Sequence, residues 1–280
     1  MEIIIFRINI RKENRKMKKL LALMLTVVMC VCMFTACSSK NEGEVASVKK
    51  AKKLIIGITE YDPMNYQEDG KWVGFDTEYA EAVCAKMGVS AEFQVIDWDS
   101  KEALLKGGNI DCIWNGFTVS EDRKKNVDFS DTYLLNKQVV VINSKDAGKY
   151  TTLDSLKGAM ITAEKESAGE TAVTAGGING NYTASAKQMD GLTAVLAGNF
   201  DAVVLDYTLA KANCGKGDFQ DLMIVESIQL ANEEYAIGFR QGSDLVEEVN
   251  KLTAELVKDG TLAKIAEKYD LTELYNEAHK

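Results

Sequence analysis

The chain has 280 residues, enough for one large domain or two modest ones, and its formal net charge is −9 at pH 7. Such acidity argues against a nucleic-acid-binding protein and against broad electrostatic contact with an anionic membrane. The only histidine is the next-to-last residue, and the six cysteines include no C-x-x-C pair. This composition argues against a Ser-His-Asp or Cys-His catalytic site and against a histidine-based metal site. We therefore expect no metal, no cofactor and no enzymatic activity.

The first 36 residues have the composition of a signal peptide. They contain seven basic and two acidic side chains, and the stretch Leu20–Ala36 carries no charge. A basic region followed by an apolar region predicts a leader that is removed on export. Met17, which is followed by two lysines, is a more ordinary start for such a leader than Met1. Removal of residues 1–36 leaves a chain with a net charge of −14.

The residues Phe34-Thr35-Ala36-Cys37 resemble the cleavage motif of bacterial lipoproteins, in which the cysteine becomes lipidated. The alternative is an uncleaved anchor helix, for which the 17 uncharged residues are marginal, because a spanning helix needs about 20. Both alternatives place the rest of the chain outside the cytoplasm, attached to the cell membrane. The polar residues 38–53 predict a tether.

Strand and helix patterns alternate from Leu54 onward. In the first half, strands are predicted at Leu54–Thr59, Ala91–Ile96, Ile110–Trp114 and Gln138–Ile142. Helices are predicted at Lys101–Lys106 and from an N-cap at Asp76 to just before Gly88. Cys84, Cys112 and Trp114 belong to these apolar patterns, which is more typical of core residues than of ligands.

The pattern restarts near Asn143. The predicted strands are Ala159–Ala163, Asp201–Asp206 and Tyr235–Phe239, and the predicted helices are Ser167–Ala175, Lys187–Ala197 and Thr208–Asn213. Near the C-terminus one apolar stripe has helical spacing: Leu245, Val249, Leu252 and Leu256. Alternation of this kind favours helices packed on largely parallel sheets, and the restart predicts two α/β halves.

Five motifs occur in order along the chain: "LIIGITEYDPMNY", "GKWVGFDTEYAEAVCAKMG", "IDWDSKEALLKGGNIDCIWNGFTVSEDRKKNVDFSDTY", "FDAVVLD" and "LVKDGTLAKIAEKY". Together they resemble the extracellular solute-binding proteins of polar amino-acid ABC transporters, from Leu54 to Tyr269. The resemblance implies a two-lobed periplasmic-binding-protein-like fold, with two α/β domains joined by two crossover strands. Lobe one would be residues 54–140 plus 235–280, and lobe two residues 141–234. The crossovers would lie near Val139–Asn143 and Leu230–Tyr235.

The implied function is to bind a free amino acid outside the cell and to deliver it to an ABC transporter permease. The implied partners are that amino acid and the permease, with membrane contact only through the lipid anchor and no nucleic acid. Two alternatives stay open. One is a dehydratase-like enzyme on the same fold, for which Glu164 would be the pocket acid, and the other is a ligand-sensing domain.

A free amino acid presents a carboxylate and an ammonium group, and burying either without a partner is costly. A guanidinium binds a carboxylate bidentately, and the resemblance gives this role to Arg123, with Thr118 beside it. Asp206 would accept from the ammonium group. Backbone carbonyls near Asn115 and Phe117, on either side of Gly116, would be further acceptors for the ammonium group. The alternatives are a solvated charge for Arg123 and a helix N-cap for Asp206.

The resemblance places the rings of Tyr61 and Trp98 on either side of the ligand. It places Ser167 and Glu164 in lobe two, although "AEKESAGE" departs from the usual G-S-S-G-E. Glu164 and Glu60 near the ligand's side chain would favour polar neutral or basic amino acids, because a second carboxylate would be repelled. A one-residue slip of the alignment would bring in Lys165 and reverse this preference.

Overall fold

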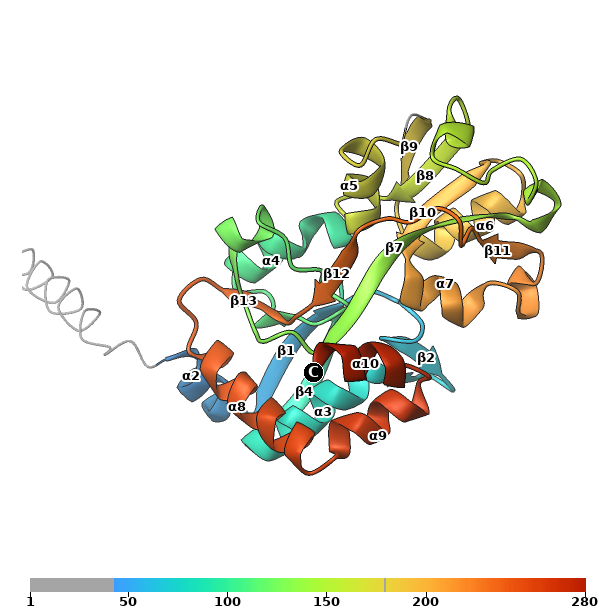
Figure 1. The fold of residues 1–280 in the computed structure, drawn as a ribbon. Coiled ribbons are helices and arrows are strands. Elements are labelled where there is room, and N and C mark those ends of the chain that lie inside the picture. The colour runs from blue at the N-terminus through green and yellow to red at the C-terminus, as the bar shows by residue number, and fades with distance from the viewer. Residues whose placement is uncertain (1–42, 179) are drawn as a thin grey trace, which may run out of the picture. The chain divides into compact units, whose positions relative to one another are not determined.

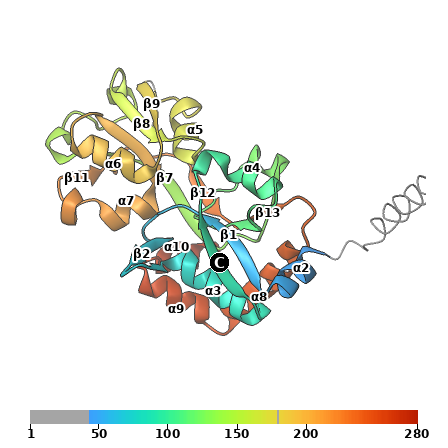
Figure 2. The same cartoon turned by 180° about the vertical axis from the view of Figure 1, so that it is seen from behind.

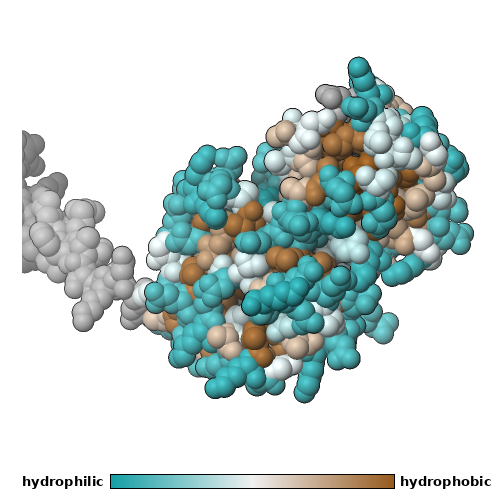
Figure 3. All heavy atoms as spheres, in the orientation of Figure 1, coloured by the Kyte–Doolittle hydropathy of each residue, from teal (hydrophilic) through white to brown (hydrophobic). Residues whose placement is uncertain are grey.

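Two β-sheets organise the structure, a computed structural model in which residues 43–178 and 180–280 are described. The expected leader and Cys37 lie outside these residues. Within them, no helix is long and apolar enough to cross a membrane. The chain from Gly43 to Lys280 clusters as one unit, and polar side chains cover most of the face shown in Figure 3.

Sheet one consists of β1 (Lys53–Ile58), β4 (Ser90–Val95), β5 (Cys112–Ile113), β6 (Val127–Phe129) and β13 (Gly238–Arg240). Their order is β4-β1-β5-β13-β6. β1 pairs in parallel with β4 and β5, whereas β13 pairs antiparallel with β5 and β6. The three parallel strands end at the same edge, so the loops that follow them lie together. A small hairpin, β2 (Tyr66–Glu68) and β3 (Lys71–Val73), lies between β1 and the first long helix in the chain.

Helices cover both faces of sheet one. On one face, α3 (Phe75–Met87), α8 (Leu245–Lys258) and α9 (Thr261–Lys268) pack together, and α4 (Lys101–Lys106) lies on the other (Figure 1, Figure 2). The residues that α8 buries are Leu245, Val249, Leu252 and Leu256, which confirms the predicted stripe.

Sheet two has the order β11-β7-β10-β8-β9. Its strands are β7 (Leu134–Asn143), β8 (Met160–Glu164), β9 (Asn181–Ser185), β10 (Ala202–Asp206) and β11 (Leu222–Ile224). β8 pairs in parallel with β9 and β10, and β7 pairs antiparallel with β10. α5 (Ala168–Thr174) covers one face, and α6 (Gln188–Leu196) and α7 (Tyr207–Asn213) cover the other. The expected two-lobed α/β fold is confirmed.

Two strands join the lobes, β7 and β12 (Asn232–Tyr235). Residues 134–137 of β7 pair with β12, and residues 138–142 pair with β10 of sheet two. The crossover expected at Val139–Asn143 was therefore placed too late, since those residues already belong to sheet two. β7 continues without interruption for ten residues, and its sequence carries no signal for where its pairing partner changes. We call residues 43–133 and 236–280 lobe one, and residues 138–231 lobe two.

The strand predicted at Tyr235–Phe239 is divided between β12 and β13. At the break, Ala236 N–H donates to the Phe117 carbonyl (3.1 Å) and Ile237 N–H donates to Ser130 Oγ (2.8 Å). These bonds to two loops of lobe one replace the regular pairing. The last helix, α10 (Thr272–Ala278), packs against β7 and so ties the C-terminus to the crossover.

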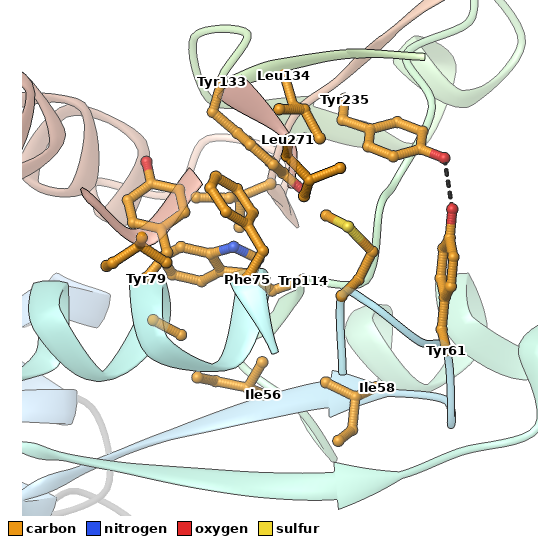
Figure 4. Packing of buried hydrophobic residues seen from close by; sticks show 14 of the residues in the cluster. Ile56, Ile58, Tyr61, Phe75, Tyr79, Trp114, Tyr133, Leu134, Tyr235 and Leu271 are labelled. Carbon is orange, nitrogen blue, oxygen red and sulfur yellow. Dashed lines mark hydrogen bonds between the residues drawn. The ribbon is translucent and has the colours of Figure 1, made fainter. Parts of the chain in front are cut away.

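The core of lobe one is rich in aromatic side chains (Figure 4). Trp114 is 1 % exposed and meets the Tyr79 ring edge-on, with 4.7 Å between ring centroids, so its prediction as a core residue is confirmed. Cys84 and Cys112 are buried, also as expected. Asp76 was wrong as an N-cap, because α3 begins after Gly74. Its buried carboxyl instead accepts from Gly116 N–H (2.7 Å) and the Tyr133 hydroxyl (3.0 Å).

The tether expected over residues 38–53 is wrong where the chain is described, because residues 44–51 form helix α2 (Glu44–Ala51). Val45 N–H donates to Asp244 Oδ1 (3.0 Å), and Lys49 Nζ lies 2.6 Å from Glu248 Oε1. Arg240 forms an ion pair with Glu44. These partners are almost 200 residues away in sequence, so the segment's own polar composition could not indicate that it docks on lobe one.

Candidate ligand-binding site

The candidate site lies where the parallel strands of both sheets end. In lobe one, the loops after β1, β4 and β5 carry Tyr61, Trp98 and residues 115–118. In lobe two, β8 ends at Glu164 and β10 ends at Asp206. Ligands of open α/β sheets commonly bind at this edge, and here two such edges come together.

A cavity of about 10 Å³ lies between the lobes. Eight of the ten expected ligand-binding residues line it: Trp98, Asn115, Gly116, Thr118, Arg123, Glu164, Ser167 and Asp206. Ala168 and Gln188 complete the lining, whereas Tyr61 and Phe117 do not take part. A cavity of this size holds about one water molecule. It adjoins a groove of about 920 Å³ that shares Thr118, Arg123 and Ala168.

Arg123 reaches both lobes. Its Nη1 donates to the Thr118 carbonyl (2.7 Å) in its own lobe, and its Nη2 donates to the Glu166 carbonyl (3.2 Å) in lobe two. The guanidinium lies over the Phe117 ring, 4.6 Å from its centroid. Burial lowers the pKa of Arg123, which the negative charges of Glu233 and Asp206 partly offset. Arg123 is thus a half-buried cation at the cavity rather than a solvated charge.

Asp206 accepts three side-chain hydrogen bonds. Its Oδ1 accepts from Asn136 Nδ2 (2.8 Å) and Gln138 Nε2 (2.7 Å), and its Oδ2 accepts from Gln188 Nε2 (2.5 Å). It occupies the N-cap position of α7, but its side chain makes no cap bond. Burial raises the pKa of this carboxyl.

Glu164 is 4 % exposed, and among the described residues none forms a hydrogen bond with its carboxyl group. Burial, and then the charge of Asp206, raise its pKa to about 8. Lys165 lies outside the cavity lining and pairs with Asp99 (2.9 Å). Glu60 is exposed, so the expectation that it faces the ligand's side chain was wrong. Of the charged residues considered for that position, only Glu164 is at the cavity.

The loop after β5 is held by bonds inside lobe one. Asn115 Oδ1 accepts from Thr59 N–H (2.9 Å) and from Asn65 Nδ2 (2.9 Å). Gly116 has φ +55°, and a Cβ there would lie 2.8 Å from the Tyr61 ring. The Phe117 carbonyl accepts from Ala236 N–H. The Asn115 side chain and the Phe117 carbonyl therefore support the site's frame.

Tyr61 and Trp98 differ in their relation to the cavity. Trp98 lines it and meets Phe117 edge-on, with 5.6 Å between centroids. The Tyr61 hydroxyl forms hydrogen bonds with Thr208 Oγ1 (2.5 Å) and with the Tyr235 hydroxyl (2.7 Å), the second of which is drawn in Figure 4. Tyr61 thus connects lobe one to α7 of lobe two, behind Gly116.

Sequence reasoning missed Lys101, Gln188 and Glu233. Lys101 is 3 % exposed, and its Nζ donates to the carbonyls of Trp98 (3.1 Å) and Glu166 (3.1 Å). Burial and the charge of Arg123 lower the pKa of Lys101 to about 8. Glu233 Oε2 accepts from Thr118 Oγ1 (3.1 Å). In the sequence all three resemble ordinary surface residues of helices and strands, and no motif marked them.

In lobe two, Ser167 caps α5, because its Oγ accepts from Glu170 N–H (3.1 Å). Glu166, which stands where the family pattern has glycine, has φ +58°. Its N–H donates to Glu170 Oε2 (2.7 Å), which holds the backbone in the left-handed region that glycine would adopt more easily. No cluster of metal-ligating side chains occurs in the described part of the chain.

Two known proteins are similar to this chain over most of its length. The chain is 31 % identical over 254 residues to the arginine-binding extracellular protein ArtP of Bacillus subtilis, covering 88 % of this chain and 96 % of that one. It is 29 % identical over 261 residues to the L-cystine-binding protein TcyJ of Escherichia coli strain K12, covering 86 % and 92 %.

Among solved structures, an amino acid ABC transporter substrate-binding protein from Streptococcus pneumoniae bound to L-arginine superposes with a TM-score of 0.75. It is 28 % identical, and the match covers 81 % of this chain and 98 % of that one. An ancestral amino acid-binding protein that preceded cyclohexadienyl dehydratase matches with a TM-score of 0.74 and 25 % identity, covering 81 % and 99 %. Residues 54–272 match the family described as bacterial extracellular solute-binding proteins, family 3. With these motifs, this fold and this match, the chain belongs to the family 3 bacterial extracellular solute-binding proteins.

Proposed function

We propose that this protein binds a free amino acid outside the cell and delivers it to an ABC transporter permease. One observation carries the proposal: Arg123 of lobe one and Asp206 of lobe two line one cavity from opposite sides. A zwitterion needs a cation for its carboxylate and an anion for its ammonium group, and burying either without such a partner is costly. The names of the two relatives, which bind arginine and L-cystine, support this proposal.

The charges at the cavity favour basic or polar neutral amino acids. Its lining residues include two acids, Glu164 and Asp206, and one base, Arg123. When Arg123 pairs with the ligand carboxylate and Asp206 with its ammonium group, Glu164 is left to face the side chain. Glu164, whose pKa is about 8, offers a ligand carboxylate no cation, whereas an ammonium or guanidinium would pair with its ionised form and an amide would donate to it.

A thermal-shift screen against the twenty amino acids, ornithine and cystine tests this proposal. A ligand at 100 times its dissociation constant adds about 2.7 kcal/mol to the stability. We expect the largest shifts from basic or amide side chains and smaller shifts from glutamate and aspartate. Tightest binding of glutamate or aspartate would overturn the ligand class, and no shift with any compound would overturn amino-acid binding.

The relatives named above are binding proteins, and we propose a binding role rather than catalysis for this chain as well. The ancestral match shows how close the two roles lie on this fold, since that amino acid-binding protein preceded a dehydratase. Glu164, with its pKa of about 8, has the protonation of a general acid at neutral pH. Turnover of a cyclohexadienyl substrate by the purified protein, lost in Glu164→Gln, would establish the enzymatic alternative instead.

Attachment through a lipid on Cys37 is also proposed. Five residues lie between Cys37 and Gly43, just before α2, so these two residues are at most about 20 Å apart along an extended chain. Because α2 is docked on lobe one, this attachment would hold lobe one close to the membrane. Cys37→Ser should abolish labelling by a radioactive fatty acid, whereas Ser38→Ala should not. Normal labelling of Cys37→Ser would place the anchor elsewhere.

A further inference from the structure

Two carboxyl groups from different elements share the same two amide donors. Asn136 Nδ2 donates to Asp206 Oδ1 (2.8 Å) and to Glu233 Oε2 (3.2 Å). Gln138 Nε2 donates to the same two oxygens, at 2.7 Å and 2.9 Å. Two amide nitrogens carry four hydrogens, so these four bonds use all of them. The oxygens of Asp206 and Glu233 are therefore close neighbours, held together by β7.

The surroundings of this carboxyl pair are short of cations. Arg123 is the cation that faces both carboxyls, and the acid beside Asp206 is Glu164, whose own pKa is raised to about 8. The remaining neighbours are neutral at pH 7: the hydroxyl of Thr118, the amide of Gln188 and the phenols of Tyr61 and Tyr235. Two carboxylates this close repel each other, and such pairs commonly hold one proton between them. Burial, and then the charge of Asp206, raise the pKa of Glu233 to about 7.

A second feature shows that the surroundings of the pair lack a donor. Gln138 is 2 % exposed, and its Oε1 has no hydrogen-bond partner among the described residues. An unpaired buried acceptor is costly. Gln138 and Glu233 line the groove of about 920 Å³, and Asp206 lines the adjoining cavity. The pair therefore stands where a ligand would enter, with an excess of acceptors around it.

We propose that Asp206 and Glu233 act as one carboxyl pair that keeps a proton until a ligand's ammonium group binds, and that then releases this proton to solvent. The proposal rests on the proposed function. In this step one carboxyl O–H bond breaks and the proton leaves through the groove. The ammonium group brings one positive charge and three N–H donors, which offset the second negative charge of the pair. Glu233 is thus a ligand-binding residue of the same site.

Proton release makes ligand affinity depend on pH. If one proton is released, the affinity rises about tenfold per pH unit below the pKa of the pair and levels off above it. The affinity should therefore level off near pH 7, because the pKa of Glu233 is about 7. Every amino acid has the α-ammonium group, so the effect should be independent of its side chain. A basic side chain at Glu164 can release a proton as well, and the experiment must separate the two sources.

Calorimetry at pH 6 in phosphate and in bis-Tris, which both buffer at this pH, counts released protons, because the two buffers differ in ionisation enthalpy. With L-arginine and with L-glutamine we expect about one proton from the pair for each ligand bound. Glu233→Gln should still bind but lose this release. Glu234→Gln is the matched control on the same strand, with an exposed side chain, and should keep it. Release with arginine alone would assign the proton to Glu164 and overturn the proposal, as would unchanged release in Glu233→Gln.

A ligand-free measurement separates this proposal from the proposed function. Carbon-13 NMR of labelled aspartate and glutamate carboxyls should show a titration step near neutral pH that disappears in Glu233→Gln, whereas the separate step of Glu164, whose pKa is about 8, should remain. Ionisation of both Asp206 and Glu233 below about pH 5 would overturn the carboxyl pair, whether or not an amino acid binds. If the step near pH 7 is present but no amino acid binds, the proposed function fails and the assignment of the ligand ammonium fails with it.

Discussion

Arg123 has a fork of donors that matches a carboxylate, and at present two of them bind the carbonyls of Thr118 and Glu166. A ligand carboxylate would offer stronger, charge-assisted acceptors at the same place. Arg123→Ala should weaken binding of every amino acid ligand, whatever its side chain. Truncating one partner of a buried charge pair costs about 2–5 kcal/mol, or roughly 30-fold to several thousand-fold in affinity.

Calorimetry with L-arginine and L-glutamine would measure this loss. Lys124→Ala is the matched control, because Lys124 is exposed and pairs with Glu121 (2.8 Å). Arg123→Lys keeps the charge without the fork of donors, and its affinity for the ligand should lie between those of Arg123→Ala and Lys124→Ala. Near-native affinity in Arg123→Ala would remove the guanidinium from the site.

Glu164 makes the protein's stability depend on pH. Its pKa is raised from 4.5 to about 8 by burial, so between these values the unfolded chain loses the proton and the folded chain keeps it. The unfolded state then binds fewer protons, and the free energy of unfolding falls as pH rises through this interval. Glu164→Gln removes this dependence and should stabilise the ligand-free protein by up to roughly a few kcal/mol at pH 8.5, with little effect at pH 4.5.

Thermal unfolding of the wild type and the variant at both pH values provides the test. Glu166→Gln, two residues away and exposed, should follow the wild type. If the stability difference between wild type and Glu164→Gln is the same at pH 4.5 and pH 8.5, the carboxyl has an ordinary pKa.

At the scale of elements, α2 is the helix whose place depends most on distant partners. Its buried residue, Val48, is 4 % exposed and packs into the core of lobe one. Its ion pair between Lys49 and Glu248 is exposed enough to contribute only about 0–1 kcal/mol. Packing of the apolar side should therefore matter more than the charges.

Val48→Ala removes two methyl groups from this contact and should lower the free energy of unfolding by about 1–2 kcal/mol. Lys50→Ala, on the exposed side of the same helix, should change it by less than about 0.5 kcal/mol. Urea denaturation measures both. Equal effects of the two substitutions would mean that α2 does not dock in solution.

At the scale of the whole molecule, contacts across the cavity hold the lobes together. Lys101 and Arg123 of lobe one both donate to the Glu166 carbonyl, and Asp99 pairs with Lys165. A cavity of about 10 Å³ cannot hold an amino acid, so a ligand enters only when these contacts part. The paired residues 134–137 and 232–235 are the places where the chain can bend without disturbing either sheet.

We expect these contacts to be parted most of the time in the ligand-free protein in solution and to re-form around the ligand. Small-angle scattering should then show a smaller radius of gyration with saturating L-arginine than without ligand. Arg123→Ala, which should not bind L-arginine at this concentration, is the control and should give the same scattering curve with and without it. Identical curves for the wild type at a ligand concentration that calorimetry shows to be saturating would contradict hinge closure.

Much of the fold follows from local patterns. Helix α8 and its four buried residues were predicted because apolar residues at helical spacing lie on one face of a helix, whatever packs against it. Asp206 was predicted as a site residue because it ends an apolar strand, where an acid without a partner would be costly. Glu164 and most of the other expected site residues came from the resemblance to the family, and eight of the ten line one cavity. Family motifs added the roles that local patterns cannot supply.

The amino-acid sequence by itself therefore determined the two α/β halves, through patterns of residues near one another in the chain, and the family and most of the cavity lining, through the order of the family motifs. Only the tertiary structure decided that Glu164 faces the cavity while Lys165 pairs with Asp99, and that Glu60 is exposed. It alone joined Asp206 to Glu233 through Asn136 and Gln138. The physical reason is that burial and the approach of distant charges are properties of two lobes packed together, and no local pattern specifies how they meet.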